Sequence, residues 1–240
     1  MVQAAGNPAE KDFLQNGGSM VSFRESYDNE LKELRNLLVV MCSQVEHDFE
    51  RLFEAVEKED QDVIETIVAK KDVTDEMERK IESKCLSLIT RQQPIAKDLR
   101  KITTALKVAG DLEREGDHIV DIAELFLRLN LTKMDSFSAH LMGMGTAAQE
   151  MIHNSVEAFI NSDEKAAEEV IVSDDVVDEL FNKVKNDLVK FIKAGSKDMD
   201  ECIDILMIAK YLEKMGDHAV NIGEWTIFQE TGAVKNIRLI

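Results

Sequence analysis

The chain has 240 residues, and its 29 Lys and Arg against 47 Asp and Glu give a formal charge of −18. This charge repels phosphate backbones and anionic lipids, so it argues against nucleic acid and against direct insertion into a membrane. At 44% hydrophobic residues the chain can bury a core. With two prolines and 5% aromatic residues, the composition favours helices over strands.

Apolar runs are far shorter than the roughly 20 residues that a membrane span needs. The three cysteines, Cys42, Cys85 and Cys202, form no CxxC pair. Zinc fingers and disulfide scaffolds are therefore excluded, and we expect a cytoplasmic protein whose thiols act as small core side chains.

Residues 1–19 contain glycine and proline with little periodicity. We expect a leader outside the fold, either disordered or vector-derived. From Ser22 onward, apolar residues recur at spacings of three and four, which is typical of amphipathic helices. Signals of helix ends divide this stretch into six helices, with breaks at Glu59-Asp60, Gln93-Pro94, Asn130 to Ser136, Ser162-Asp163 and Gly195-Ser196.

An internal repeat relates the two halves. Asp111–Glu124 reappears as Tyr211–Glu224 at an offset of 100 residues, and Lys71–Met77 aligns with Asp174–Leu180 at an offset of 103. Each unit has room for three long helices. The sequence therefore predicts an all-α fold of two tandem three-helix bundles. The bundles span residues 20–131 and 132–230, and residues 231–240 form a C-terminal tail.

Four acidic residues share one face of the last helix in the first repeat. With Glu113 at 0° on a helical wheel, Asp117 falls near 40°, Asp121 near 80° and Glu124 near 20°, at about 100° per residue. The apolar side chains occupy the opposite sector, which must face the core. They are Val108, Leu112, Ile119, Ile122 and Phe126.

The second repeat carries the same stripe, with Glu213, Asp217, Asn221 and Glu224 on one face. Asn221 replaces an aspartate, which leaves this stripe one charge poorer. Gly116 and Gly216 lie inside the two helices, where glycine costs about 0.5–1 kcal/mol relative to alanine. Glycine beside an acidic stripe indicates that something approaches the backbone closely.

Carboxylates from adjacent helices bind hard cations such as Mg²⁺ and Mn²⁺, and iron in oxygen-rich sites. If the second helix of each bundle runs antiparallel to the third, Asp72 and Asp75, and in the other half Asp175 and Asp178, supply the facing ligands. The sequence does not distinguish iron, zinc, manganese or magnesium. The competing interpretation is a solvated acidic face with no functional metal.

The paired Leu-Glu-x-x-Gly-Asp-His segments, the Gln93–Arg100 stretch and the Asp-x-x-Asp pairs resemble the PhoU family of phosphate-signalling regulators. The resemblance runs from about Met20 to Gln229. It implies surface metal clusters held by Glu113 and Asp117 in one repeat, and by Glu213 and Asp217 in the other.

The resemblance also implies no catalytic residue. The expected role is a negative regulator that links a PstB-like transporter ATPase subunit to a PhoR-like sensor histidine kinase at the inner face of the membrane. A homodimer is compatible with this interpretation.

A second function class is a ferritin-like dimetal oxidoreductase. Glu115 with His118, and Glu150 with His153, match its Glu-x-x-His spacing. Neither pair is duplicated, because Glu115 corresponds to Met215 and His153 to Glu50. Such a site also needs ligands that face a bundle interior.

Overall fold

The computed structural model describes residues 8–92, 94–129, 138–195 and 198–233. All regular structure within these ranges is α-helical. The helices are α1 (Pro8–Glu57), α2 (Gln61–Val68), α3 (Val73–Gln92), α4 (Ala96–Arg128), α5 (Ser138–Asn161), α6 (Glu164–Lys193) and α7 (Met199–Thr231).

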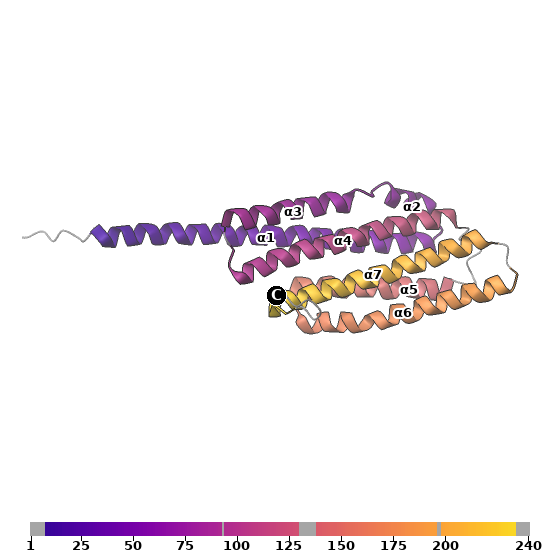
Figure 1. The fold of residues 1–240 in the computed structure, drawn as a ribbon. Helices are drawn as coiled ribbons and strands as arrows, with labels where there is room; N and C mark the ends of the chain where they lie inside the picture. The colour runs from indigo at the N-terminus through magenta and orange to yellow at the C-terminus, as the bar shows by residue number, and fades with distance from the viewer. Residues whose placement is uncertain (1–7, 93, 130–137, 196–197, 234–240) are drawn as a thin grey trace, which may run out of the picture.

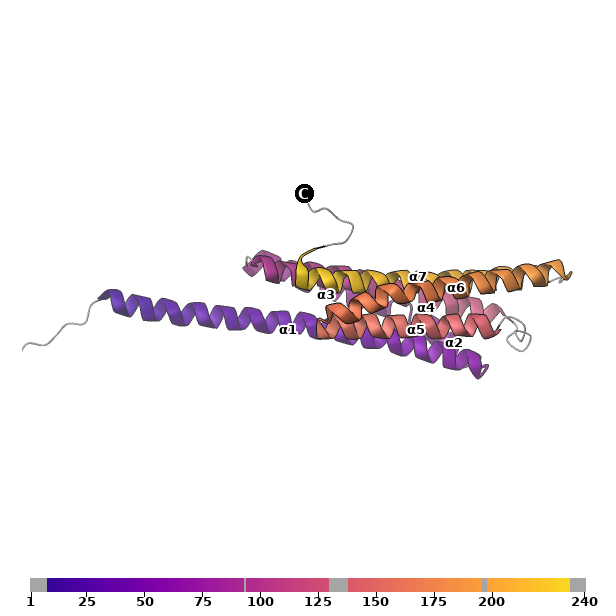
Figure 2. The same ribbon diagram turned by 90° about the horizontal axis from the view of Figure 1, so that it is seen from below.

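The helices form two bundles that lie side by side, as the internal repeat predicts. Helices α1 to α4 make the first bundle and α5 to α7 the second (Figure 1). The bundles meet chiefly where α4 packs against α7, and also where α1 contacts α5 (Figure 2). The last helix of each repeat therefore has one face toward its own bundle and another toward the other repeat.

Helix α1 begins at Pro8, so residues 8–19, expected in a leader, are helical instead. This part of α1 projects beyond the rest of the molecule (Figures 1 and 2). Residues 1–7 lie outside the described residues, as does most of the expected C-terminal tail. Only 231–233 of that tail are described, and Gly232 ends α7 in a left-handed conformation with φ 75°.

The structure differs from the six expected helices in the first repeat, where the second helix is divided into α2 and α3. The intervening residues 69–72 are all exposed, and Lys70 Nζ lies 3.8 Å from Asp48 Oδ1 of α1. The corresponding stretch of the second repeat continues as helix α6. Both α2 and α3 pack against α4, and the acids that act on Glu113 and Asp117 from this side belong to α3.

Other helix ends follow the expected chemistry. Asp60 accepts a hydrogen bond from the Val63 amide, and Asp163 accepts bonds from two amides of the first turn of α6. Gly195 follows α6 with φ 88°, in the left-handed region that suits glycine. Ser196, the expected cap of α7, lies outside the described residues, and α7 instead begins after Asp198.

The side chains assigned to the core sector of the helical wheel are buried. Ile119 has 1% of its surface exposed, and the other four expected core residues of α4 have none. The cysteines are free and buried, in agreement with their predicted role as core side chains. None of the described helices combines the length and apolar character that a bilayer crossing requires.

Candidate functional site

Four carboxylates face one another across α3 and α4. Asp75 and Glu78 lie one turn apart on α3, while Glu113 and Asp117 lie one turn apart on α4. We call these residues the first acidic cluster. Burial raises the pKa of Glu113, and the charges of Asp117 and Glu78 raise it further. The pKa of Asp117 is raised by burial and then by Asp121 and Asp75.

These raised pKa values have a simple cause. Partly buried carboxylates of like charge disfavour one another's ionised form. Arg79 pairs with Asp75 at 2.7 Å between Nη2 and Oδ2, but this arginine side chain is 70% exposed, so solvent screens its charge. The first acidic cluster therefore concentrates negative charge that nearby basic side chains compensate only in part.

A second acidic cluster occupies the related place on α6 and α7, formed by Asp174, Asp178, Glu213 and Asp217. Burial raises the pKa of Asp174, and Asp178, Asp217 and Glu213 raise it further through their charges. The two clusters differ in detail because Asp174 corresponds to Lys71 in the repeat. Each cluster thus combines the predicted pair on the last helix with two acids from the preceding helix.

Lysines neutralise part of the second acidic cluster. Lys210 Nζ lies 2.5 Å from Glu213 Oε2, Lys214 Nζ lies 3.3 Å from the same oxygen, and Lys214 also pairs with Asp217. The repeat places Gly110 where Lys210 stands. A Cβ at Gly110 would lie 3.3 Å from Glu78 Oε1, so this position brings the α4 backbone close to the first acidic cluster.

The predicted site residues separate into two groups. Asp75, Asp178 and the Glu-x-x-x-Asp pairs of α4 and α7 belong to the clusters. Asp72 is exposed and is absent from the charges that shift Glu113 and Asp117. Asp175 is also exposed, and its charge is the weakest of those acting on Asp174.

Asp121 adjoins the first acidic cluster, since its charge raises the pKa of Asp117, and Asp121, Glu124 and Asn221 also lie toward the other repeat. The charges of Asp121 and Glu124 raise the pKa of Tyr211, after the larger effect of burial. Asn221 Nδ2 donates to Asp111 Oδ1 at 3.2 Å. These three residues therefore contribute to the contact between α4 and α7. Glu224 is half-buried on the same helix as Asn221.

Glu78 and Asp174 were not among the predicted ligands. Their spacing was a usable signal, because Glu78 follows Asp75 by three residues and Asp174 precedes Asp178 by four, and both spacings place side chains on one helix face. In the described parts of the chain, no three His, Cys, Asp or Glu side chains converge closely enough to hold a metal ion.

Gly116 and Gly216 allow neighbouring helices to approach α4 and α7 closely. A Cβ at Gly116 would lie 2.5 Å from Thr74 Oγ1, and a Cβ at Gly216 would lie 3.0 Å from Asp174 Oδ1. The close approach expected from the sequence is therefore made by α3 and α6. This tight packing brings the acids of adjacent helices together.

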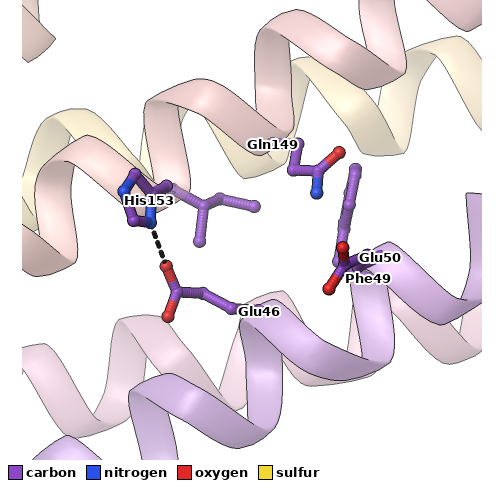
Figure 3. A pocket seen from close by; sticks show the side chains of 6 residues that line it. Glu46, Phe49, Glu50, Gln149 and His153 are labelled. Atoms are coloured by element: carbon purple, nitrogen blue, oxygen red, sulfur yellow. Dashed lines mark hydrogen bonds and ion pairs between the residues drawn. The ribbon is translucent and has the colours of Figure 1, made fainter.

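The residues with ferritin-like spacing occupy different environments. Glu115 is fully buried, whereas Glu150 and His153 are exposed on α5. His153 Nδ1 pairs with Glu46 Oε1 of α1 at 2.8 Å, beside a polar pocket between the repeats (Figure 3). The described residues therefore do not place a Glu-x-x-His pair of each repeat around one bundle interior, as a ferritin-like centre requires.

Comparisons with known proteins agree with this architecture. The family model described as "PhoU domain" matches residues 38–126 and 141–226, one match in each repeat. The chain is 38% identical over 210 residues to the phosphate-specific transport system accessory protein PhoU homolog of Clostridium acetobutylicum, which covers 87% of this chain and 96% of that protein. A homolog from Thermotoga maritima is 32% identical over 88% of this chain and 91% of its own length.

A solved structure shows the same fold. The crystal structure of PhoU from Pseudomonas aeruginosa superposes with a TM-score of 0.81 at 28% identity, covering 86% of this chain and all of that chain. The family match in both repeats, the identity to these relatives and the shared fold lead to one conclusion. The chain belongs to the PhoU family.

Proposed function

We propose that the protein is a negative regulator of phosphate uptake and of the response to phosphate starvation. The observation that carries this proposal is the family match over both repeats, since the relatives are named accessory proteins of the phosphate-specific transport system. The protein acts in the cytoplasm as a non-catalytic adaptor between the transporter ATPase subunit and a sensor histidine kinase. A net charge of −18 suits basic surfaces on such partners.

The proposal includes metal ions at the two acidic clusters. Oxygen donors on adjacent helices are the ligands that hard cations prefer. A bound cation would supply the positive charge that these mutually repelling carboxylates lack, and would fix α3 against α4 and α6 against α7. The first acidic cluster offers only oxygen donors, which suit such an ion, and Asp75, Glu78, Glu113 and Asp117 would have to draw closer together to hold one.

The second acidic cluster fits a cation less well. Lys210 and Lys214 already occupy oxygens of Glu213 and Asp217, so an ion must displace them. We therefore expect the first acidic cluster to hold its ion more tightly than the second.

The regulatory role predicts a change in phosphate transport. In a bacterial strain that lacks its own relative of this protein, we expect high phosphate uptake in phosphate-replete medium. Expression of this chain is expected to lower the initial uptake rate to that of the undeleted strain, because the adaptor restores repression. Uptake of radiolabelled phosphate measures the effect, and the same strain with an empty vector is the control.

The same cells test the adaptor arrangement. Affinity purification of the tagged chain, followed by mass spectrometry, is expected to recover the transporter ATPase subunit and the sensor kinase. An uptake rate that stays at the level of the deletion strain, with the chain present at normal abundance and neither partner recovered, would contradict the proposed function.

A further inference from the structure

A pocket with a volume of about 360 Å³ lies between the two repeats, and no residue of the acidic clusters lines it. Helices α1 and α4 contribute Lys32, Arg35 and Lys101 to its lining, while the end of α5 and α7 contribute Phe159 and Gln229. We call it the inter-repeat pocket. Its volume lies within the range of about 300–1,000 Å³ that is typical of small-molecule sites.

The inter-repeat pocket is basic although the chain is strongly acidic. The lining contains three basic side chains, Lys32, Arg35 and Lys101, and a single carboxylate, Asp28. Where side chains are described, no salt bridge joins Asp28, Lys32 or Lys101 to another residue. Arg35 donates from Nη2 to the Ile160 carbonyl at the end of α5. This bond positions the guanidinium and leaves its other N–H groups available.

The basic character does not follow from the repeat. At the related end of the molecule, Ser138 stands for Arg35, Glu201 for Lys101 and Leu129 for Gln229. Three matched positions thus lose a cation or a polar amide, and one gains a negative charge. The matched positions of the sequence therefore do not repeat the basic lining of the inter-repeat pocket.

The floor of the pocket is apolar. Leu34, Leu38 and Ala105 are almost fully buried, and Phe159 has 7% of its surface exposed. Gln229 adds a polar edge, since its Nε2 donates to Ser162 Oγ at 3.3 Å and leaves the amide oxygen free to accept. A ligand for this site therefore carries an anionic group toward the lysines and an apolar group toward Phe159.

We propose that the inter-repeat pocket binds a small phosphate monoester with an aromatic or aliphatic group. A phosphate dianion has enough charge and acceptor oxygens to engage Lys32, Arg35 and Lys101 together, whereas a carboxylate carries a single charge. Because the lining comes from both repeats, a bound monoester contacts both at once. This inference depends neither on metal binding nor on the regulatory proposal.

Titration calorimetry of the full chain with phenyl phosphate tests the inference. The expected result is saturable binding of one equivalent, weakened at least about 10-fold by K32Q/K101Q, because the double variant removes two charge-assisted hydrogen bonds to the phosphate. The matched control K165Q/K183Q removes the same charge from two lysines of α6 that do not line the pocket. It is expected to change the affinity less than about twofold.

Inorganic phosphate and benzoate separate the two parts of the ligand. Both are expected to bind at least about 10-fold more weakly than phenyl phosphate, since one lacks the apolar group and the other the second charge. Equal binding of either would overturn the assignment to a phosphate monoester. Lys32 is exposed, so the K32Q variant leaves the core intact. The assignment of the binding site would be overturned if phenyl phosphate did not bind at millimolar concentration, or if wild type and K32Q bound it with equal affinity.

Discussion

Replacing Glu115 with methionine is expected to stabilise the protein. Glu115 is fully buried on α4, and neither carboxyl oxygen has a hydrogen-bond partner among the described residues. The equivalent residue in the second repeat, Met215, is also fully buried. The E115M variant therefore places in the first repeat the side chain that the second repeat already uses. Removing an unpaired buried carboxyl is expected to contribute about 1–3 kcal/mol to the free energy of unfolding.

The gain from E115M should increase with pH. Burial, followed by the charges of Asp111 and Glu46, raises the pKa of Glu115 well above its ordinary value of 4.5. Below pH 4.5 the carboxyl is protonated in both the folded and the unfolded chain, so it adds no pH dependence. Above pH 4.5 the unfolded chain releases this proton while the folded chain retains it. The wild type then loses up to about 1.4 kcal/mol of stability per pH unit from this group, until the folded-state pKa is reached.

Urea unfolding followed by circular dichroism at pH 5 and pH 8 measures both effects. E115Q is the matched control, because glutamine abolishes the charge but leaves a polar group without a partner. We expect the gain of E115Q to rise with pH as that of E115M does, because both variants remove the titrating carboxyl, but to be smaller than that of E115M at each pH. The explanation fails if E115M is less stable than the wild type at pH 8, or if its gain is the same at both pH values.

The G145A variant is expected to be destabilised although alanine is the better helix former. Gly145 of α5 packs against Phe53 of α1 at the contact between the repeats, and a Cβ at this position would lie 2.1 Å from Phe53 Cε1. The Phe53 ring cannot move freely, because it stacks on the Phe49 ring and meets the Phe126 ring edge-on. The distances between ring centroids are 4.8 Å and 6.2 Å. Such overpacking costs about 1–3 kcal/mol, more than the 0.5–1 kcal/mol gained from helix propensity.

Gly143 provides a control in the same helix. A Cβ at Gly143 would meet Leu180 Cδ2 at 3.9 Å, an ordinary contact, so G143A is expected to gain about 0.5–1 kcal/mol. Thermal and urea unfolding of the two variants measure the difference. If G145A is as stable as G143A, the close packing of α5 on Phe53 is not a constraint on the contact between the repeats.

Much of the fold could be predicted because it depends on local patterns. The core face of α4 follows from a spacing of three and four residues, and the buried side chains Val108 and Ile119 lie where the helical wheel placed them. Gly195 and Asp163 mark helix ends through chemistry that involves neighbouring residues only. The division between α2 and α3 was missed because exposed residues 69–72 include neither glycine nor proline.

The parts that could not be predicted depend on the register between helices. The register between α3 and α4 places Glu78, and not Asp72, where its charge acts on Glu113. The inter-repeat pocket joins Lys32 to Lys101 and Gln229, which are distant in the chain, and no periodicity relates them. On the helical wheel Glu115 falls near 200°, at about 100° per residue, within the apolar sector, but this position does not show that its carboxyl lacks a partner.

Metal analysis of the purified protein tests most directly the claim that the two acidic clusters are cation sites. Iron, zinc, manganese and magnesium are measured by inductively coupled plasma mass spectrometry in the wild type, E113Q/D117N and E213Q/D217N. The control E164Q/E168Q neutralises an exposed pair of the same spacing on α6.

We expect the wild type and the control to retain metal, and both cluster variants to retain less. The loss is expected to be larger for E113Q/D117N, since lysines already neutralise the second acidic cluster. An unchanged metal content in E113Q/D117N and E213Q/D217N, or an equal loss in the control, would contradict this assignment.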